Sequence, residues 1–411
     1  MSEPFGREGL PLDDARQRIL EALAPLGSVE TVPLALALGR VPAEAIHAPA
    51  AVPGFAASIM DGYAIASDAI PSLGQRWQCV GRAGAGAPYQ GRLEAGQAIR
   101  ILTGAPIPEG CGRVLPQELV HRAGDNLELV KAAGANRWIR QADEEASLGQ
   151  VLVEPGCRLG PADLGRLAGC GVKELRVATK PRIGLLVSGD ELLPPGQERQ
   201  LGQIWESNST LLRALLERLG YGVADCRIEG DDPEPMRQAL VELAHSCDVV
   251  VSSGGISAGD SDWIRPLVNE LGSLNFWKLF LKPGRPFAWG QLQGTPFFGL
   301  PGNPVAAAIT ALQLLWPALQ RLEGAEVQLL PRLRVRLANP LQRGAGRPEL
   351  ARASLRFDAD GAAIAEVQGS QASSRIGSLQ GADLLLEIPA EAGNLEAGTA
   401  LWAQLLRLPL L

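Results

Sequence analysis

The sequence is poor in the residues that build soft-metal and redox centres. Its 411 residues include only three histidines and six cysteines, and no two cysteines form a C-x-x-C pair. This scarcity excludes a histidine-rich zinc or iron centre, and the scattered cysteines favour reduced, mostly buried thiols. A metal bound by this chain would therefore need oxygen ligands.

Long apolar runs and an excess of positive charge are also missing. No uninterrupted apolar run reaches the length of a membrane span, and the N-terminus has no basic start followed by an apolar core. We therefore expect a cytoplasmic protein that has no membrane partner and no secretory signal. The net charge of -7 argues against a chain built mainly to bind nucleic acid, and 46% hydrophobic residues argue against a disordered one.

The first half of the chain changes character twice. Apolar residues at helical spacing after an acidic first turn predict a helix over residues 12–24. Glycine- and proline-rich sequence with short apolar runs then predicts a β-rich domain over 49–149, and a helical pattern returns near 161–168. If this second helix packs beside the first, residues 1–48 and 150–180 form one small helical or mixed N-terminal domain, and the β-rich domain is inserted into it.

The second half begins with a strand–helix alternation over residues 181–329. The apolar run RIGLLVSG is typical of a parallel strand buried on both faces, and VAAAITALQLLWPALQRL predicts the longest helix of the chain. This alternation predicts a doubly wound α/β domain with right-handed crossovers. Short alternating runs over 330–411 predict a small closed or sandwiched β-domain, so the predicted class is α/β plus β.

Polar clusters follow three successive strands of the predicted sheet. They are Ser188–Glu191, Gly230–Asp232 and Ser252–Gly255. Ligands of open α/β sheets bind beyond the carboxyl ends of the strands, and glycine turns expose backbone N–H groups that can hold a phosphate. Ordinary turn formation is the alternative for each cluster alone, but three clusters together favour a binding site.

Three carboxylates fall at this predicted edge. Glu191, Asp231 and Asp262 together would suit Mg²⁺ that bridges phosphate oxygens, so we predict that they hold a metal. Asp231 and Asp262 have an alternative interpretation as helix N-caps. Glu191 is harder to explain in that way.

A basic segment and a rigid turn complete the predicted site. Lys278 and Lys282 stand four residues apart in FWKLFLKPGRP, which puts both on one face if the segment is a strand. A solvated strand face is the alternative, but apolar neighbours and the nearby Arg285 favour an anion site. The GLPGNP turn at 299–304 fits an architectural role and a ligand-binding role equally well.

Seven segments match, in order, the motifs of the molybdopterin molybdenumtransferase family, which includes the bacterial MoeA enzymes and the E domain of gephyrin. They are PGFAASIMDGYAI (53–65), RILTGAPIPEG (100–110), VSGDEL (187–192), GQIWESN (202–208), SSGGISAGDSDW (252–263), FWKLFLKPGRPFAWG (276–290) and GLPGNPVAA (299–307). They extend over most of the chain. MDGYA together with KPGRPF and GLPGNP is a specific combination, so the chain resembles this family strongly.

The resemblance implies a cytoplasmic enzyme of molybdenum cofactor biosynthesis. It would take adenylylated molybdopterin and molybdate, release AMP and leave molybdenum on the dithiolene sulfurs, with Mg²⁺ or a similar cation. The family subunit is elongated, has four parts and forms a homodimer, and its cleft lies between the α/β domain and the β-rich domain of the partner subunit. The resemblance also implies exchange with the molybdopterin adenylyltransferase and with cofactor-accepting enzymes.

The resemblance carries family functional positions onto individual residues of this chain. The predicted catalytic positions are Asp61, Glu145, Glu191, Asp231, Asp262, Lys278 and Lys282. The predicted substrate-binding positions from the resemblance are Thr103, Arg140, Arg352 and Ser370. The strand-end clusters, the basic segment and the turn add Ser188, Gly189, Ser253, Gly254, Gly255, Arg285 and Pro301 to the substrate-binding positions.

The sequence departs from the family pattern in the β-rich domain. Ala56 and Ala57 replace two polar residues, Asp143 replaces a glycine, and Glu145 replaces a functional aspartate. Displacing a catalytic group by about 1 Å can lower a rate by roughly a hundredfold. The alternative is therefore a divergent paralogue that binds molybdopterin or the finished cofactor as a carrier, without efficient metal insertion.

Two other enzyme classes fit less well. The molybdopterin adenylyltransferase resembles the α/β domain alone, and it would leave the flanking motifs unexplained. A nicotinamide dehydrogenase is disfavoured because no G-x-G-x-x-G turn follows the first strand of the α/β domain.

Overall fold

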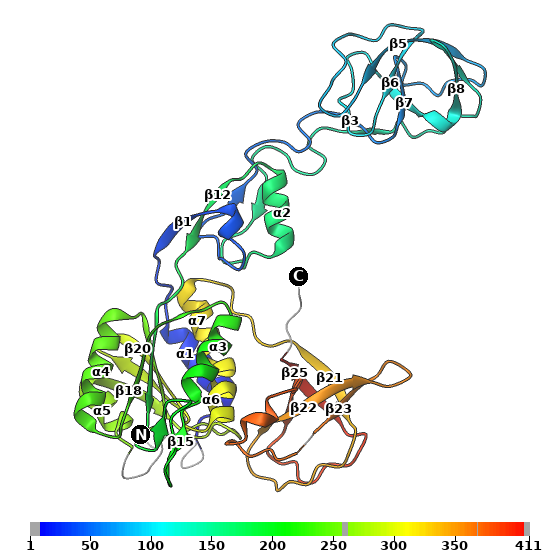
Figure 1. Cartoon of the computed structure of the whole chain (residues 1–411). Coiled ribbons are helices and arrows are strands. Elements are labelled where there is room, and N and C mark those ends of the chain that lie inside the picture. Colours follow the sequence, from blue (N-terminus) through cyan, green and yellow to red (C-terminus); the bar gives the residue numbers. More distant parts are fainter. Residues whose placement is uncertain (1–8, 257–261, 368, 407–411) are drawn as a thin grey trace. The chain divides into compact units, whose positions relative to one another are not determined.

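The chain forms two compact units. The computed structural model describes residues 9–256, 262–367 and 369–406 (Figure 1). One unit combines the N-terminal segment to Glu30 with residues 156–158 and the chain from Val177 onward, and the other holds residues 31–155 and 159–176. Each unit has its own sheets and its own core.

A six-stranded sheet is the centre of the first unit. Its order is β16 (Val223–Glu229), β13 (Ile183–Ser188), β17 (Val249–Ser253), β20 (Thr295–Leu300), β19 (Ala288–Leu292) and β18 (Gly272–Trp277). The first four strands are parallel, whereas β19 is antiparallel to both of its neighbours. β18 therefore runs in the direction of β20, and its carboxyl end lies at the same edge as those of the parallel strands.

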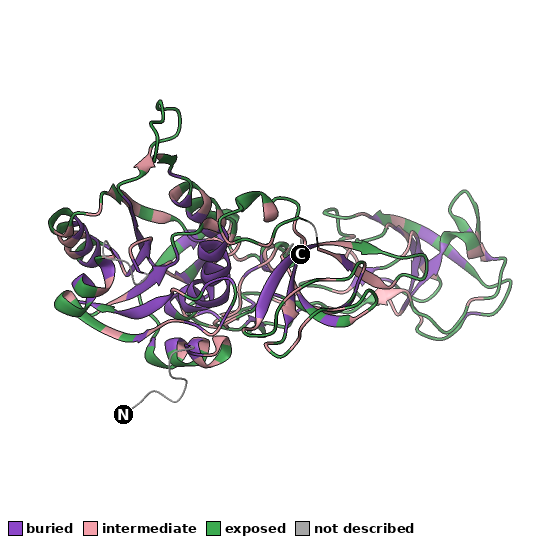
Figure 2. Ribbon diagram, turned by 90° about the horizontal axis from the view of Figure 1, so that it is seen from below, coloured by how far each residue is buried: buried purple, intermediate pink, exposed green. Residues whose placement is uncertain are grey.

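Helices cover both faces of this sheet, which confirms the predicted doubly wound α/β domain (Figure 1). They are α1 (Leu12–Ala22), α3 (Asn208–Arg218), α4 (Pro233–Ser246), α5 (Ile264–Leu271), α6 (Pro304–Thr310) and α7 (Trp316–Glu323). Side chains alternate along β13, so that Leu185 and Val187 pack toward α1, α3, α6 and α7, whereas Leu186 packs toward α4 and α5. Figure 2 shows the central strands, such as β13 and β17, as buried and the outer helix faces as exposed.

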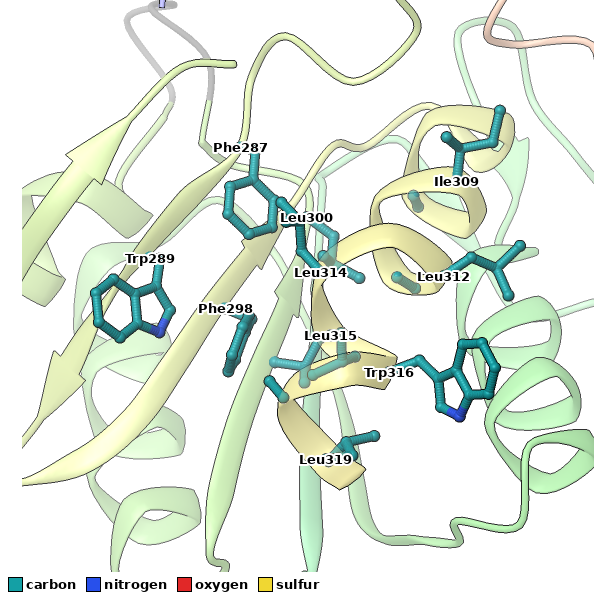
Figure 3. Packing of buried hydrophobic residues seen from close by; sticks show 14 of the residues in the cluster. Phe287, Trp289, Phe298, Leu300, Ile309, Leu312, Leu314, Leu315, Trp316 and Leu319 are labelled. Atoms are coloured by element: carbon teal, nitrogen blue, oxygen red, sulfur yellow. The ribbon is translucent and has the colours of Figure 1, made fainter. Parts of the chain in front are cut away.

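The long predicted helix is present and forms the core of this unit. It runs through α6, a π-helical turn (η3, Ala311–Leu315) and α7. Pro317 has no backbone N–H to donate within the helix, which is consistent with the local π geometry. Figure 3 shows its apolar residues beside Phe287, Phe298 and Leu300 of the sheet. The helix is long and apolar enough to cross a membrane, but 94% of its apolar window is buried inside the unit, as in a core helix.

The N-terminal helix finds its partner far along the chain. α1 packs against α7 and the π-helical turn, and Arg16 donates from Nε to the carbonyl oxygen of Gln313 at 3.0 Å. The second predicted helix is α2 (Pro161–Gly169), which packs against β11 (Val151–Val153) and a short 3₁₀ helix (η1, Leu34–Leu36). α1 belongs to the first unit and α2 to the second, and the packing of one helix beside the other stays a prediction.

A buried polar triad ties residues 156–158 to the α/β domain. Arg158 Nη2 donates to Glu323 Oε2 at 2.6 Å and to the Tyr221 hydroxyl at 2.8 Å. The Tyr221 hydroxyl donates to the same Glu323 oxygen at 2.8 Å. Tyr221 and Glu323 are almost fully buried, so each donor offsets part of the cost of placing the Glu323 carboxylate away from water.

The predicted C-terminal β-domain is a closed barrel. Its strand order is β21 (Arg332–Leu337), β23 (Ala363–Glu366), β22 (Glu349–Phe357), β24 (Leu384–Ile388) and β25 (Ala400–Leu405), with a short 3₁₀ helix (η4, Ile376–Ser378). Inward side chains such as Leu384 and Leu386 fill the barrel. Closure leaves no free sheet edge within the barrel.

The second unit contains the predicted β-rich domain. Its six-stranded sheet has the order β7 (Arg113–Pro116), β4 (Gly62–Ile65), β6 (Gln97–Ile101), β5 (Arg76–Ala83), β9 (Asn126–Leu129) and β8 (Val120–Ala123), with a 3₁₀ helix (η2, Gln117–Leu119). Both faces of the sheet are apolar: Tyr63 and Ile65 pack on one face and Ala64 packs on the other.

Four short strand pairs complete the structure. They are β1 (Val29–Pro33) with β12 (Glu174–Ala178), β2 (Ile46–His47) with β11, β3 (Ala57–Ser58) with β10 (Ile139–Arg140), and β14 (Leu192–Leu193) with β15 (Ile204–Trp205). The pair of β3 and β10 connects the MDGY segment to Arg140, because Ala57 lies opposite Arg140.

Tyr221→Phe removes one donor from the buried Glu323 carboxylate. We expect the α/β unit to lose about 1–2 kcal/mol of unfolding free energy, since a buried acceptor loses a hydrogen bond while the ring stays in place. Urea unfolding of the full chain, followed by circular dichroism, measures this loss. Tyr89→Phe in the second unit is the matched control and should leave this transition unchanged. Equal midpoints for Y221F and the parent would contradict the role given to the triad.

Candidate functional site

Two neighbouring strand ends of the α/β sheet come into very close contact. β13 lies between β16, which is the next strand of this sheet along the chain, and β17. The carboxyl ends of β13 and β17 therefore meet where the strand order reverses. Gly254 has φ +100° there, and a Cβ on it would lie 2.6 Å from the Ser188 carbonyl oxygen. Gly255 has φ +62°, and a Cβ on it would lie 3.0 Å from the Ser188 hydroxyl oxygen. The backbone contact leaves room only for glycine at Gly254, and the left-handed conformation favours glycine at both positions.

The predicted GLPGNP turn belongs to the same loop cluster. A Cβ on Gly302 would lie 3.4 Å from Gly254 Cα. Ser253 Oγ donates to the Pro301 carbonyl oxygen at 3.2 Å. The buried Ser188 hydroxyl has no hydrogen-bond partner within the described residues, so it can still bind a polar ligand. The structure thus brings Ser188, Ser253, the glycine pair and Pro301 together, as predicted.

Asn208 holds this cluster together, and sequence analysis missed its role. Its buried amide donates from Nδ2 to Ser253 Oγ at 2.9 Å and to the Gly302 carbonyl oxygen at 2.7 Å. In the structure Ser207 is the N-cap residue without a capping bond, and Glu206 accepts from the Ser209 backbone N–H at 2.8 Å instead. The signal available was the GQIWESN motif, which ends at Asn208.

Acidic side chains from the three predicted loops lie at this edge. Asp190 Oδ1 accepts from the Asp231 backbone N–H at 2.8 Å. Burial, followed by the negative charges of Asp190, Glu191 and Asp262, raises the pKa of the Asp231 carboxyl above its usual value. Asp232, and not Asp231, is the N-cap of α4, accepting from the Glu234 N–H at 3.0 Å. The alternative interpretation of Asp231 as a cap is therefore wrong.

These carboxylates fit a hard cation that shares its ligands with a substrate. Their mutual repulsion, which adds to burial in raising the pKa of Asp231, would be relieved by Mg²⁺, and carboxylate oxygens are the ligands that Mg²⁺ takes. Within the residues that the structure describes, no three Asp, Glu, His or Cys side chains form a complete ligand cluster. The Ser257–Ser261 part of the SSGGISAGDSDW motif lies outside the described residues. A cation here would need substrate phosphate oxygens to complete its coordination.

Lys278 lies at the same edge, but not in a strand. β18 ends at Trp277, and Lys278 follows in the left-handed region at φ +77°. The prediction that Lys278 and Lys282 share one strand face is therefore wrong. The Lys278 ammonium lies 3.9 Å from the centroid of the Trp277 ring. Partial burial, Arg285 and Arg265 lower the pKa of Lys278 below its usual value, in that order of effect.

Lys282 points to a buried carboxylate at the junction with the barrel. Its ammonium forms an ion pair with Glu349 Oε1 at 3.1 Å, while Arg343 Nε contacts Glu349 Oε2 at 3.3 Å. Arg347 lies nearby, and its Nη1 donates to the Leu281 carbonyl oxygen at 3.1 Å. Burial and then the charge of Arg285 lower the pKa of Arg347. Sequence analysis did not identify this additional positive charge around one carboxylate.

The barrel supplies the two remaining predicted positions. Arg352 is 2% exposed, and its Nη2 donates to the Ala372 carbonyl oxygen at 3.3 Å. Ser370 is exposed, and its hydroxyl accepts from the Ala372 N–H at 3.3 Å. Arg352 Nη1 is buried and has no hydrogen-bond partner within the described residues. Arg352 and Ser370 therefore both bond to the backbone of Ala372. The Arg352 guanidinium keeps one N–H group without a partner among the described residues.

The predicted residues of the second unit form separate local pairs. Asp61 Oδ1 accepts from the Thr103 N–H at 2.8 Å and from the Thr103 hydroxyl at 2.9 Å. These two bonds, with a smaller contribution from Arg100, lower the pKa of the Asp61 carboxyl. Arg140 lies 3.8 Å from Glu144.

The departures from the family pattern have local structural correlates. Glu145 is exposed and lies 3.6 Å from Arg166 Nε. Asp143, which stands where the family has glycine, adopts φ +60°. Aspartate tolerates this left-handed conformation better than most residues. Ala57 is buried in β3, and Ala56 is half-buried beside it.

A separate cavity lies elsewhere in the first unit. It measures about 610 Å³ and lies between α1, the π-helical turn and the barrel, with Arg16, Gln313, Glu349 and Trp402 among its lining residues. None of the predicted glycines or aspartates lines it. Its position does not coincide with the strand-end cluster, where the predicted residues converge.

Family models match three consecutive parts of the chain. Residues 10–171 match the model of the MoeA N-terminal region (domain I and II), residues 184–321 match the probable molybdopterin binding domain, and residues 334–406 match the MoeA C-terminal region (domain IV). These matches follow the order of the motifs along the sequence.

Relatives of known name extend over almost the whole chain. A molybdopterin molybdenumtransferase of Haemophilus influenzae is 34% identical and covers 95% of this chain and 96% of its own. Molybdopterin molybdenumtransferase 2 of Mycobacterium tuberculosis is 31% identical, over 94% and 97%. Gephyrin of Dictyostelium discoideum is 29% identical over 96% of this chain and 62% of its own. The crystal structure of the molybdopterin biosynthesis moeA protein of Pyrococcus horikoshii superposes with a TM-score of 0.83 at 28% identity, over 97% of this chain and 100% of that chain.

Thr103→Val removes the hydroxyl donor to Asp61 and leaves the backbone N–H in place. Since both Thr103 bonds lower the Asp61 pKa, we expect it to rise toward its usual value. A carboxyl with a lowered pKa adds stability at higher pH, and this contribution is lost as pH falls through the folded-state pKa. T103V should therefore lose less stability in acid. Carboxyl NMR titration measures the pKa; Thr103→Ser keeps the donor and should keep the parent value.

Asp143→Val tests whether position 143 must adopt the left-handed conformation. A β-branched residue at φ +60° is strained, so we expect the second unit to lose about 1–2 kcal/mol of unfolding free energy. Asp143→Gly should be tolerated. Thermal unfolding compares these variants with Ala142→Val at the neighbouring position. Equal losses for D143V and A142V would show that the backbone conformation is not the cause.

Proposed function

Because the chain belongs to the molybdopterin molybdenumtransferase family, we propose that it inserts molybdenum from molybdate into adenylylated molybdopterin and releases AMP. The observation that carries this proposal is the convergence at one sheet edge of the glycine cluster, the acidic loops and Lys278. Backbone N–H groups, carboxylates and an ammonium are the three kinds of group that a phosphoanhydride with a bound cation requires.

The glycine cluster would bind the anionic part of the substrate. The close approach of Gly254 and Gly255 to Ser188 leaves room for phosphate oxygens to reach backbone N–H groups, and the Ser188 hydroxyl offers a further polar contact. Gly189, Ser253 and Pro301 complete these loops. Asn208 would keep them in position when the ligand binds.

Glu191, Asp231 and Asp262 would hold the Mg²⁺ on the phosphoanhydride. Bound there, Mg²⁺ neutralises phosphate charge and makes AMP a better leaving group. The hydrogen bond from the Asp231 N–H to Asp190 Oδ1 would hold the two acidic loops together beside the cation. At a pH below its raised pKa, Asp231 would be protonated and would bind a cation less well.

Basic residues at the carboxyl end of β18 and near the barrel would bind oxyanions. Lys278 lies at the strand end, whereas Lys282, Arg285, Arg352 and Ser370 lie toward the barrel. Water would add to the phosphoanhydride and break its P–O bond, so that AMP leaves and the pterin keeps its terminal phosphate. The two dithiolene thiols would then bind molybdenum in place of one molybdate oxygen, which leaves as water with the two thiol protons. The lysines would neutralise the charge on AMP and on molybdate, and the unsatisfied Arg352 donor suits an oxyanion.

The second unit would contribute its residues within a homodimer in the cytoplasm. Asp61, Thr103, Arg140 and Glu145 lie in this unit, and the family places such residues opposite the α/β domain of the partner subunit. The tight bonds from Thr103 keep the Asp61 carboxylate ionised and oriented. We also propose that the adenylyltransferase supplies the substrate and that cofactor-accepting enzymes receive the product. Sedimentation of the purified chain tests the dimer.

The carrier alternative has no support from the relatives that we found. Those from Haemophilus influenzae and Mycobacterium tuberculosis are named as transferases. Purified protein with adenylylated molybdopterin, Mg²⁺ and molybdate should release AMP only when molybdate is present, and it should yield loaded pterin. Tight pterin binding without AMP release would contradict the proposed reaction and indicate a carrier.

Lys278→Ala should abolish efficient insertion and leave the protein folded. Loss of one preorganised charge at a reacting centre lowers rates by about 10²–10³-fold, and we expect a loss of that size in molybdate-dependent AMP release. Lys173→Ala removes a surface lysine that lies 3.9 Å from Glu174, and it is the matched control. K278A activity within a few-fold of K173A would contradict the role given to Lys278.

A further inference from the structure

The indole ring of Trp277 connects two cations to the glycine loop. Arg265 Cζ lies 3.6 Å from the ring centroid and Lys278 Nζ lies 3.9 Å from it. The indole N–H donates to the Ile256 carbonyl oxygen at 3.0 Å. One side chain at the end of β18 thus contacts the start of α5, the predicted anion-binding lysine and the loop that follows β17.

The position of Arg265 is unfavourable for the helix that carries it. Arg265 is the second residue of α5, where the helix dipole disfavours a cation, and the first turn of α5 has no acidic residue. Its charge also repels the Lys278 ammonium and helps to lower the Lys278 pKa. The Arg265 Nε is buried without a hydrogen-bond partner in the described part of the chain. Helix stability therefore does not explain an arginine at this position, and Lys278, which is also a cation, does not attract it.

We propose that Arg265 is a positioning residue that acts on Lys278 through Trp277. The inference rests on the proposed function, because it concerns the lysine to which that function assigns substrate charge. A cation over an aromatic ring is attracted to the ring electrons, so Arg265 and Lys278 both bind Trp277 and restrict its movement. The indole bond to Ile256 fixes the ring relative to the glycine loop. Lys278 is thereby held at the sheet edge in its left-handed conformation.

The arrangement also favours a ligand with several negative charges. Arg265 and Arg285 both lower the pKa of the Lys278 ammonium through their positive charge. Their repulsion is relieved when a phosphate or molybdate oxyanion enters among them. Removing Arg265 should therefore weaken oxyanion binding and raise the Lys278 pKa.

The test follows the titration of one amine without any substrate. The chain has five lysines, so competitive acylation across pH, read by mass spectrometry, reports each one separately. In Arg265→Gln the pH at which Lys278 is half-acylated should rise. Arg265→Lys keeps a positive charge and should restore the parent value. Arg334→Gln is the matched control, since Arg334 also lies over a tryptophan, 5.1 Å from Trp402; it should leave Lys278 unchanged.

Activity supplies a second readout. We expect R265Q to lower molybdate-dependent turnover by about tenfold, one order less than a displacement of about 1 Å at a reacting group can cause. The alkaline limb of its pH profile should move to higher pH, and R265K should recover most of the activity. Trp277→Phe keeps a ring but loses the bond to Ile256, and it should fall between R265K and R265Q.

The outcomes separate the two proposals. Unchanged Lys278 acylation in folded R265Q would overturn the role of Arg265, whatever the enzyme activity. A parent protein that shows no molybdate-dependent AMP release would overturn the proposed function, even if Lys278 titrates as expected. A raised half-acylation pH in R265Q, with recovery in R265K, supports the positioning role.

Discussion

The contact between Gly254 and the Ser188 carbonyl oxygen is the constraint on which the site depends. It follows from parallel pairing of β13 with β17, which puts their carboxyl ends side by side at the point where the strand order reverses. Any larger residue at Gly254 would separate these ends. Asn208 then ties the same strand ends to the Gly302 turn. The acidic loops and Lys278 lie at this edge because each follows a strand of the same sheet.

The sequence predicted this edge well and its connections poorly. Continuous apolar runs identify β13 and β17, and glycine-rich sequence after each strand locates the loops. The conformation of Lys278 could not be predicted, because the strand ends at Trp277 and Lys278, with φ +77°, no longer follows the alternation along a strand. The role of Asn208 could not be predicted either. Its amide donates to Ser253, which is 45 positions away in the chain, and to Gly302, which is 94 positions away. Such long-range bonds leave no local pattern.

The altered residues of the second unit are compatible with its fold. Asp143 adopts the backbone conformation that a glycine would allow, and Ala57 is buried in a short strand opposite Arg140. Glu145 keeps a carboxylate at the family position, within reach of Arg166. The residues at these positions thus suit the backbone that the structure gives them.

The partnership of α1 with the helix 304–323 has a consequence for synthesis of the chain. Arg16 and Gln313 are separated by 297 positions, so α1 cannot pack against the helix 304–323 until more than three quarters of the protein has left the ribosome. The second unit, residues 31–155 and 159–176, is complete much earlier and can fold first. During that interval Ala15 and Ile19 lack the native packing against this helix. The order of emergence thus makes the first helix one of the last to reach its native place.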